Sequence, residues 1–362
     1  MVGLFRPLLD LKGNKMKKYV LAIIVLLMFA TDAFAHTSAF DIEWWSQATY
    51  SNQPGNTLKK WAEGMEGRVG NLGTGNIYYV DSGVANEGDG SSWANAKDTL
   101  NEAIDLCTAD NGDVIYVAQG HSETMGDAAD EVDIDVSGVT IIGCGEGLLR
   151  PTFDYTATTT GAFAIGADDI TIINLRFHAN VTDVNEAIEI EAGSEQVSII
   201  GCLFDVESEG TDEFLECIDS SGGAGSDRLS VIGCEFYMGA GACNAAICTK
   251  DSDYSVFKDN VTFGDYAVAC IYNTTQSNHI LIENNRLFNG TIGGNAGLNS
   301  EPGIELAATT TGIISNNFIA CNLATKAASV VAADCYLFEN YYNEDESSAG
   351  TGGIIGTASA DD

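Results

Sequence analysis

The chain has 362 residues, of which 45% are hydrophobic, enough for the core of one large domain or of two smaller ones. Its 52 acidic and 16 basic residues give a formal net charge of −36 at pH 7. That charge repels nucleic acid, anionic lipid and polyuronates, and we expect no nucleic-acid partner. An acidic surface keeps a protein soluble in salty water or binds divalent cations, which makes calcium the one cofactor that the composition suggests.

The first 35 residues have the order of a secretory signal peptide behind a short upstream extension. Met16-Lys17-Lys18 precedes an apolar run from Tyr19 to Ala30, and Ala33-Phe34-Ala35 has the small residues of a cleavage site. The run is too short to span a membrane, and no other stretch reaches about 18 apolar residues. We predict cleavage after Ala35, a secreted or particle-surface location, and no membrane span in the mature chain. A retained N-terminal anchor is the alternative.

Residues 36–75 contain three tryptophans among scattered Gly and Asn, and we predict an attachment or cap segment there. Two short strands follow, at Ile77 to Val80 and at Asp113 to Ala118. Apolar residues at helical spacing between these strands predict a helix over Asp98 to Cys107. We expect this helix to cap the open end of the repeat array that begins after it, where strand edges and core would otherwise be exposed.

From Val139 onward one phrase recurs: apolar, any, apolar, any, any, Cys or Asn, any, apolar. Its reference positions are 144, 175, 202, 234, 260, 285, 317 and 340, which are 23 to 32 residues apart. Each copy contains short runs of alternating apolar and polar residues, and no helical pattern separates them. The chain is therefore predicted to be an all-β parallel solenoid over residues 76–345, with loops of variable length.

The last segment, residues 346–362, is rich in Gly, Ser and acidic residues and is predicted to be a flexible tail. With it the chain divides into four parts. These are the extension and signal peptide (1–35), the attachment or cap segment (36–75), the parallel β-helix (76–345) and the acidic tail (346–362).

Equivalent side chains of a parallel solenoid form columns, because strands that recur once per coil stack about 4.8 Å apart. The repeated phrase predicts an internal column that becomes an amide ladder at a turn. Its members are Cys144, Cys202, Cys234, Asn285, Asn317 and Asn340. A second column is expected to place three more cysteines on consecutive coils, as reduced buried thiols or, in a poorer geometry, as disulfides. These are Cys217, Cys248 and Cys270.

The segments around the first strands resemble right-handed parallel β-helix proteins of the pectate-lyase-like superfamily. The resemblance rests on Ile77-Tyr-Tyr-Val-Asp81, on the loop Asn86 to Trp93, and on Gly112-Asp-Val-Ile-Tyr-Val-Ala-Gln-Gly-His121. The continuation from Val139 to Thr152 is similar to β-helix proteins of bacteriophages and environmental viruses. The resemblance covers residues 77–342 and implies a right-handed solenoid with an N-terminal capping helix. It implies little about function, because lyases, glycosidases, tailspikes and adhesins share this scaffold.

No catalytic phrase of that superfamily is recognisable in the chain. From the residues alone, the best carboxylate pair is Glu189 with Glu216, expected at equivalent outward positions of adjacent coils. Retaining glycosidases place two carboxyl groups about 5 Å apart. Surface solvation, or contact with a cation or glycan, are alternative interpretations of the same pair. His121 and His178 are weaker candidates for a general base.

Other outward side chains are weak candidates for binding. Two acids that alternate with apolar residues in one strand, and one tyrosine able to stack on a sugar, are ligand-binding candidates. They are Asp133, Asp135 and Tyr272. A Gly-rich loop contains three acids that could ligate calcium or simply belong to the loop. They are Asp81, Glu87 and Asp89.

These observations predict an exported, non-enzymatic solenoid that binds polysaccharide, a cell-surface glycan or another surface, on a virion or cell envelope. The main alternative is a secreted polysaccharide lyase or glycoside hydrolase that uses an outer carboxylate cluster. A third hypothesis is a structural assembly unit, in which residues 36–75 attach the protein or make a homo-oligomer.

Overall fold

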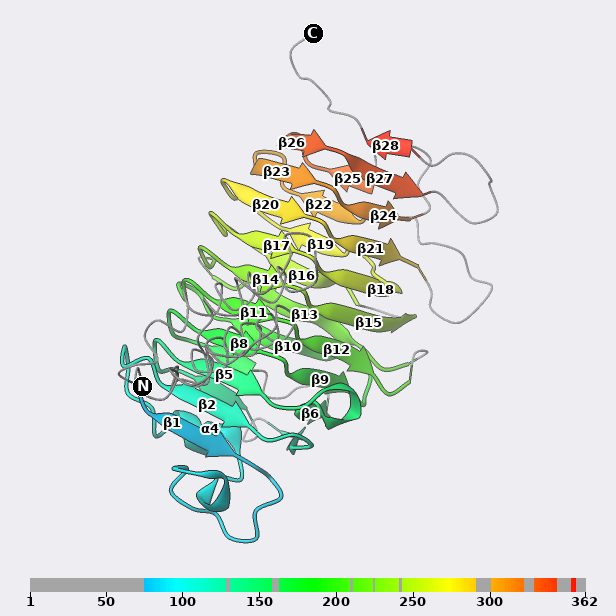
Figure 1. The fold of residues 1–362 in the computed structure, drawn as a ribbon. Coiled ribbons are helices and arrows are strands. Elements are labelled where there is room, and N and C mark those ends of the chain that lie inside the picture. The colour runs from blue at the N-terminus through cyan, green and yellow to red at the C-terminus, as the bar shows by residue number, and fades with distance from the viewer. Residues whose placement is uncertain are drawn as a thin grey trace, which may run out of the picture. The chain divides into compact units, whose positions relative to one another are not determined.

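The computed structural model describes residues 75–127, 131–157, 163–208, 211–223, 225–240, 243–290, 301–321, 329–343 and 353–355. These residues form a solenoid of stacked coils, from blue β1 at the N-terminal end to red β27 at the other (Figure 1). The predicted signal peptide, and the attachment segment up to residue 74, lie outside the described residues. No helix in the described part of the chain is long and apolar enough to cross a membrane.

Three sheets, here named A, B and C, follow one another in each coil. Sheet A consists of β1 (Ile77–Val80), β2 (Val114–Val117), β5 (Thr140–Gly143), β8 (Thr171–Ile173), β11 (Ser198–Ile200), β14 (Ser230–Ile232), β17 (Val256–Lys258), β20 (Ile280–Glu283), β23 (Thr311–Ser315) and β26 (Asp334–Phe338). Sheet B consists of β3 (Ser122–Met125), β6 (Thr152–Tyr155), β9 (Arg176–Ala179), β12 (Leu203–Val206), β15 (Glu235–Ala240), β18 (Val261–Asp265), β21 (Arg286–Asn289), β24 (Phe318–Ala320), β27 (Asn340–Asn343) and β28 (Gly353–Ile355). Sheet C consists of β4 (Val132–Ile134), β7 (Phe163–Ile165), β10 (Val184–Ile190), β13 (Phe214–Ser220), β16 (Ala245–Thr249), β19 (Ile271–Asn273), β22 (Ile304–Leu306) and β25 (Val330–Val331). The predicted all-β parallel solenoid is confirmed.

The corner between sheets A and B is tight because one residue per coil adopts a left-handed backbone. Asn, Gly and Asp reach that conformation at low cost, and they occupy the corner on six of seven consecutive coils. The corner residues are Asn174, Gly201, Gly233, Asp259, Asn284, Asn316 and Glu339. Each lies directly before the repeated Cys or Asn position. The need for a left-handed residue at this corner therefore explains part of the phrase that recurs in the sequence.

The predicted amide ladder is confirmed, and Asn260 belongs to it as well. In each coil the Asn side-chain oxygen accepts the backbone N–H of the ladder residue one coil earlier. The distances are 2.9 Å from Cys234 to Asn260, 2.9 Å from Asn260 to Asn285, 2.9 Å from Asn285 to Asn317 and 3.1 Å from Asn317 to Asn340. All four amides are buried, so the ladder satisfies backbone groups that water does not reach.

Cys217, Cys248 and Cys270 lie on consecutive coils, as predicted, but they do not share one column. Cys217 and Cys270 point into the core, whereas Cys248 pairs with Asp219 on the outer side of sheet C. The period of two breaks in β13, where the neighbours Cys217 and Ile218 are both buried. All ten cysteines are free thiols, in agreement with their interpretation as small apolar fillers.

The N-terminal end of the solenoid is capped by a short helix, as predicted. Helix α4 (Leu100–Ile104) buries Leu100, Ala103 and Ile104 against β1, β2 and β4. The Thr99 hydroxyl accepts the Glu102 backbone N–H at 3.4 Å, which begins the helix. One 3-10 turn, η2 (Trp93–Asn95), precedes the helix, and another, η4 (Gly147–Leu149), follows β5.

The C-terminal end contains one more strand, and the rest of the predicted flexible tail, residues 346–362, lies outside the described residues. Within that segment, β28 pairs antiparallel with β27, joining Ile355 to Asn340 and Gly353 to Tyr342. The described part of the tail therefore covers the last edge of sheet B. Covering an open edge satisfies the backbone groups that it would otherwise present.

Candidate functional site

The outer face of sheet C presents one row of side chains along the solenoid axis. Strand pairing places eight residues in a single column, of which Ala164 and Cys248 are buried. They are Asp133, Ala164, Glu189, Asp219, Cys248, Tyr272, Glu305 and Val331. Three residues that the sequence suggested separately, Asp133, Glu189 and Tyr272, therefore lie in the same row. Asp135 follows directly after β4, at the end of the same face.

The predicted stacking of Glu189 on Glu216 is wrong by three residues. Strands β10 and β13 pair Glu186 with Glu216, and Glu189 with Asp219. The reason is an irregularity in β10: Ala187 and Ile188 are both buried, so the outward Glu186 and Glu189 are three residues apart. A strict period of two does not reproduce this spacing. The structure thus yields two stacked carboxylate pairs where the sequence predicted one.

The electrostatics of the two pairs distinguish their members. Burial, and then the charges of Glu189, Asp219 and Glu216, raise the pKa of Glu186 to about 7. Burial also raises the pKa of Glu216, but the Asn244 amide donates to its Oε1 at 2.8 Å and opposes that rise. Glu186 therefore retains its proton at a pH where Glu216 is more readily ionised.

Such a pair is suited to two kinds of chemistry. A protonated carboxyl beside an ionised one is the arrangement by which glycosidases protonate a leaving group and stabilise or attack the sugar. The same outward oxygens accept hydrogen bonds from sugar hydroxyls. Among the described residues, the eight strands of sheet C contain no Lys, Arg or His. The strands themselves therefore supply no cationic side chain to hold an anionic substrate or to act as a lyase base.

His121 lies away from this face and is buried. Its Nδ1 accepts the Ser82 backbone N–H at 2.9 Å, so Nε2 is the protonated nitrogen and donates to Glu123 Oε1 at 2.8 Å. The side chain has no exposed surface. Both ring nitrogens are thus engaged in holding the first coil together, and the ring does not reach a substrate.

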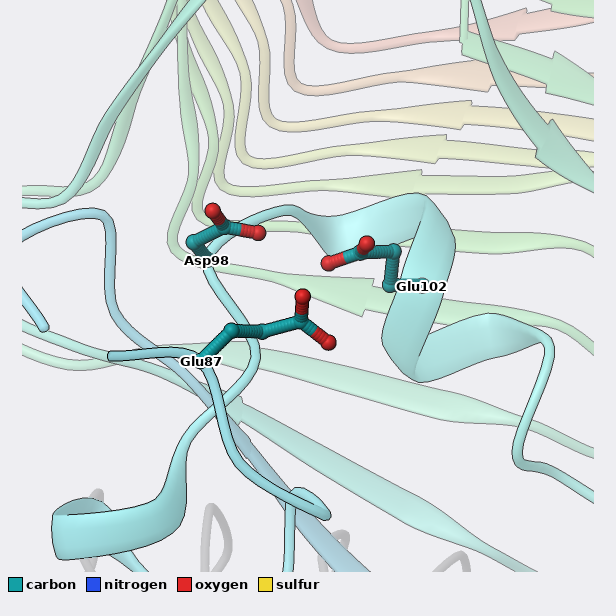
Figure 2. A group of neighbouring side chains, drawn as sticks. All are labelled: Glu87, Asp98 and Glu102. Carbon is teal, nitrogen blue, oxygen red and sulfur yellow. The ribbon is translucent and has the colours of Figure 1, made fainter.

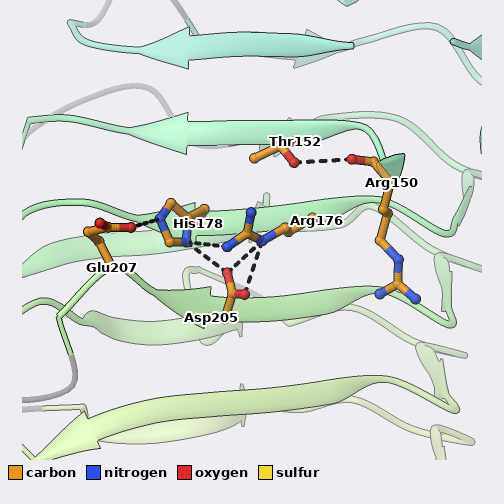
Figure 3. Close-up of polar contacts among 6 residues, drawn as sticks. All are labelled: Arg150, Thr152, Arg176, His178, Asp205 and Glu207. Atoms are coloured by element: carbon orange, nitrogen blue, oxygen red, sulfur yellow. Dashed lines mark hydrogen bonds and ion pairs between the residues drawn. The ribbon is translucent and has the colours of Figure 1, made fainter. Parts of the chain in front are cut away.

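His178 belongs to a polar cluster on the outer face of sheet B, with Arg176, Asp205 and Glu207 (Figure 3). Arg176 Nε donates to both carboxylate oxygens of Asp205, at 2.9 and 3.0 Å. His178 Nδ1 lies 2.8 Å from Asp205, and Nε2 lies 3.3 Å from Glu207. Asp205 is the register partner of His178 one coil later, so the coil repeat contained the signal that sequence reasoning missed.

The hydrogen bond that His178 donates to the Asp205 carboxylate raises the pKa of His178, against burial and the positive charge of Arg176. Because its pKa is higher in the folded protein, protonated His178 stabilises the fold. This contribution is complete below the ordinary histidine pKa of 6.5 and is lost as the pH rises through the folded-state pKa. We expect His178→Gln to lower the free energy of unfolding by about 1 kcal/mol near pH 5. Urea denaturation at acidic and at mildly alkaline pH checks this; a loss that does not shrink at the higher pH contradicts it.

The calcium candidates of the Gly-rich loop do not converge. Asp81 accepts the Gly83 N–H at 2.8 Å and Asp89 accepts the Ser91 N–H at 3.0 Å, so each closes its own short turn. Glu87 instead approaches the beginning of α4. These side chains shape the loop, and the three do not form a common ligand set.

Glu87 lies with Asp98 and Glu102, whose carboxylates face one another in Figure 2. Their ligand atoms are all within 4.8 Å of one another. Lys97 pairs with the Glu87 carboxylate, and the proximity of Asp98 to Glu102 adds to burial in raising the pKa of Glu102. A cation would have to displace Lys97, so we assign no metal to this group.

No protein-family model and no curated protein matches the chain. Among solved structures, pectate lyase Pel9A superposes with a TM-score of 0.50 at 15% identity, over 75% of this chain and 70% of that one. Pectin methylesterase from Aspergillus niger gives 0.45 at 13% identity, over 75% and 88%. A pectate lyase from Bacillus sp. N165 gives 0.40 at 15% identity, over 78% and 86%. The likeness to Pel9A shows the fold alone: the chain is a parallel β-helix whose fold is similar to that of this lyase.

Proposed function

We propose that the protein binds an uncharged polysaccharide along the outer face of sheet C. The observation that supports this most directly is the single register row from Asp133 to Glu305, in which all side chains except Ala164 and Cys248 are at least partly exposed. A linear polymer that runs parallel to the axis meets an equivalent position at every coil, so weak contacts add along its length. Carboxylates accept from sugar hydroxyls, and Tyr272 offers an aromatic surface.

The charge of the face supports an uncharged ligand. The described strands of sheet C contain no cationic side chain, and the whole chain has a formal charge of −36. A polyuronate would meet like charges along its whole length. In this proposal the protein is exported, as residues 1–35 suggest, and it binds without turnover at a cell or particle surface.

Glycoside hydrolysis is the second candidate, and one observation favours it. Glu186, with a pKa raised to about 7, lies opposite Glu216, which an amide of Asn244 holds by a hydrogen bond. In that case Glu186 would donate the proton to the leaving oxygen and Glu216 would act as the base or nucleophile.

One experiment on the purified protein tests both candidates. Affinity is measured for neutral glucans, mannans and xylans and for polygalacturonate, and reducing ends are assayed in the same mixtures. We expect binding to a neutral polymer that weakens about fivefold in Tyr272→Ala and in Asp219→Asn. Glu235→Gln, an exposed acid on sheet B, serves as the matched control and is expected to bind like the parent protein.

The outcomes separate the hypotheses. Selective binding of polygalacturonate, or affinity unchanged in both sheet C variants, would contradict the proposed site. Release of reducing ends that disappears in Glu186→Gln would replace binding with hydrolysis as the function of this face.

A further inference from the structure

A second face of the solenoid has a different chemistry. Strands β5, β8, β11 and β14 of sheet A contain no charged residue, in a chain with 52 acidic ones. They lie side by side on four consecutive coils (Figure 1). Each presents two outward residues, a hydroxyl side chain and an isoleucine. The hydroxyl row is Thr140, Thr171, Ser198 and Ser230, and the isoleucine row is Ile142, Ile173, Ile200 and Ile232.

The two rows are in strict register and rigidly held. Thr140 pairs with Thr171, and Ile142 with Ile173, and the same offset continues through the next two coils. The backbone N–H groups of the hydroxyl row are used within the coil stack, as from Thr171 to Val139 at 3.0 Å. We call these eight residues the neutral face. Its spacing is that of the strands, about 4.8 Å, and its side chains need no reordering to meet a partner.

The hydroxyl groups of the neutral face have no protein partner. None of the four hydrogen-bonds to another residue in the described part of the chain, whereas Ser194, Ser252 and Thr310 elsewhere do so. All eight side chains are partly exposed. The corner that follows is also uncharged, with Asn174, Gly201 and Gly233. The face ends along the axis at β17, where Lys258 pairs with Ile232.

The area of the neutral face limits what it binds. Four strands and two side-chain rows cover on the order of 200 Å². A stable protein complex buries roughly 800 Å² on each partner, so a second copy or another folded protein would need contacts well beyond this face. Its regular spacing and its lack of charge instead match a flat, periodic and uncharged surface that both donates and accepts hydrogen bonds.

We propose that the neutral face binds ice. Its hydroxyls, fixed at the strand spacing, each donate and accept, and so hold water in a row of the same spacing. The adjacent isoleucines offer that water no competing partner, so it keeps its hydrogen bonds to other water molecules. Ice is an uncharged lattice in which every water donates two hydrogen bonds and accepts two, whereas ionised side chains orient water around themselves. Four identical contacts then act together on a rigid support.

The test is independent of the polysaccharide site, which lies on another sheet. Full-length protein is assayed for inhibition of ice recrystallisation and for incorporation into a growing ice front. We expect activity at micromolar concentration that falls at least about tenfold in Ile173→Lys and in Ser198→Lys, which place a charge in the centre of the face. Leu281→Lys, an outward position of β20 on the same sheet beyond the neutral face, is the matched control and is expected to retain activity.

Circular dichroism and thermal unfolding establish that the variants are folded, because the substituted side chains point outward and leave the core unchanged. Ice activity no greater than that of an unrelated acidic protein overturns the proposal, as does an equal loss in Leu281→Lys. A dimer that Ile173→Lys converts to monomer, or adsorption to microcrystalline cellulose that Ile173→Lys abolishes without ice activity, assigns the face to another partner and also overturns it.

Discussion

Asn285→Ala is expected to lower the free energy of unfolding by about 3 kcal/mol, the largest single effect that we predict. Asn285 Oδ1 accepts from the Asn260 backbone N–H at 2.9 Å and from its side-chain amide at 3.0 Å. Its own amide donates to the Phe257 carbonyl at 2.9 Å and to Asn317 Oδ1 at 2.8 Å. Alanine leaves these buried groups unpaired, and each unpaired group costs about 1 to 3 kcal/mol.

Urea denaturation followed by circular dichroism measures this loss. The matched control is Asn185→Ala, which removes an exposed asparagine from strand β10 and is expected to change stability by less than about 0.5 kcal/mol. Hydrogen exchange adds a local readout, since coils of a solenoid contact mainly their neighbours and the loss of protection is expected around Asn260 and Asn317. Equal destabilisation by the two variants would show that the ladder has no special role.

Glu186→Gln is expected to stabilise the protein by about 1.5 kcal/mol near pH 8, after allowance for solvent screening. The folded protein raises the pKa of this carboxyl from 4.5 to about 7, chiefly by burial and then by the charges of Glu189, Asp219 and Glu216. A folded state that holds the proton more tightly loses stability as the pH rises between those two values. Glutamine has no proton to lose, so the gain should vanish near pH 4.5 and be complete above pH 7.

Thermal unfolding of both proteins across that pH range is the measurement. Glu235→Gln is the control, because removing any negative charge from so acidic a chain relieves some general repulsion. A gain in Glu186→Gln that matches the control, or that does not depend on pH, would remove the basis for treating Glu186 and Glu216 as a distinct pair. It would leave the neutral face on sheet A untouched, since that face contains no titrating group.

The two faces divide the surface of one scaffold by chemistry. Sheet C presents carboxylates in rows, and strands β5, β8, β11 and β14 of sheet A present hydroxyl and methyl groups. Both depend on the same property of a parallel solenoid, which repeats an outward position at a constant spacing. A similar local sequence in successive coils therefore places similar side chains in a continuous row on the surface. The register between coils decides which side chains share a row.

The sequence by itself determined the solenoid, because its causes are local. A left-handed corner residue before each repeated position, alternating apolar residues in short runs, and a Cys or Asn at the repeated position all occur within a single repeat. The same holds for the capping helix, whose apolar spacing and Thr99 cap are contained in a few residues. Such features predict coils, strands and the amide ladder without knowledge of distant contacts.

Only the tertiary structure decided which residues meet. In sheet C the paired buried neighbours Ala187 and Ile188 shift the alternation, so Glu186, and not Glu189, lies opposite Glu216. The partners of His178 come from the next coil, and His121 is buried by a contact with the loop residue Ser82. Register between coils depends on packing across the core and on loops of unequal length, and neither is encoded in the period of one strand.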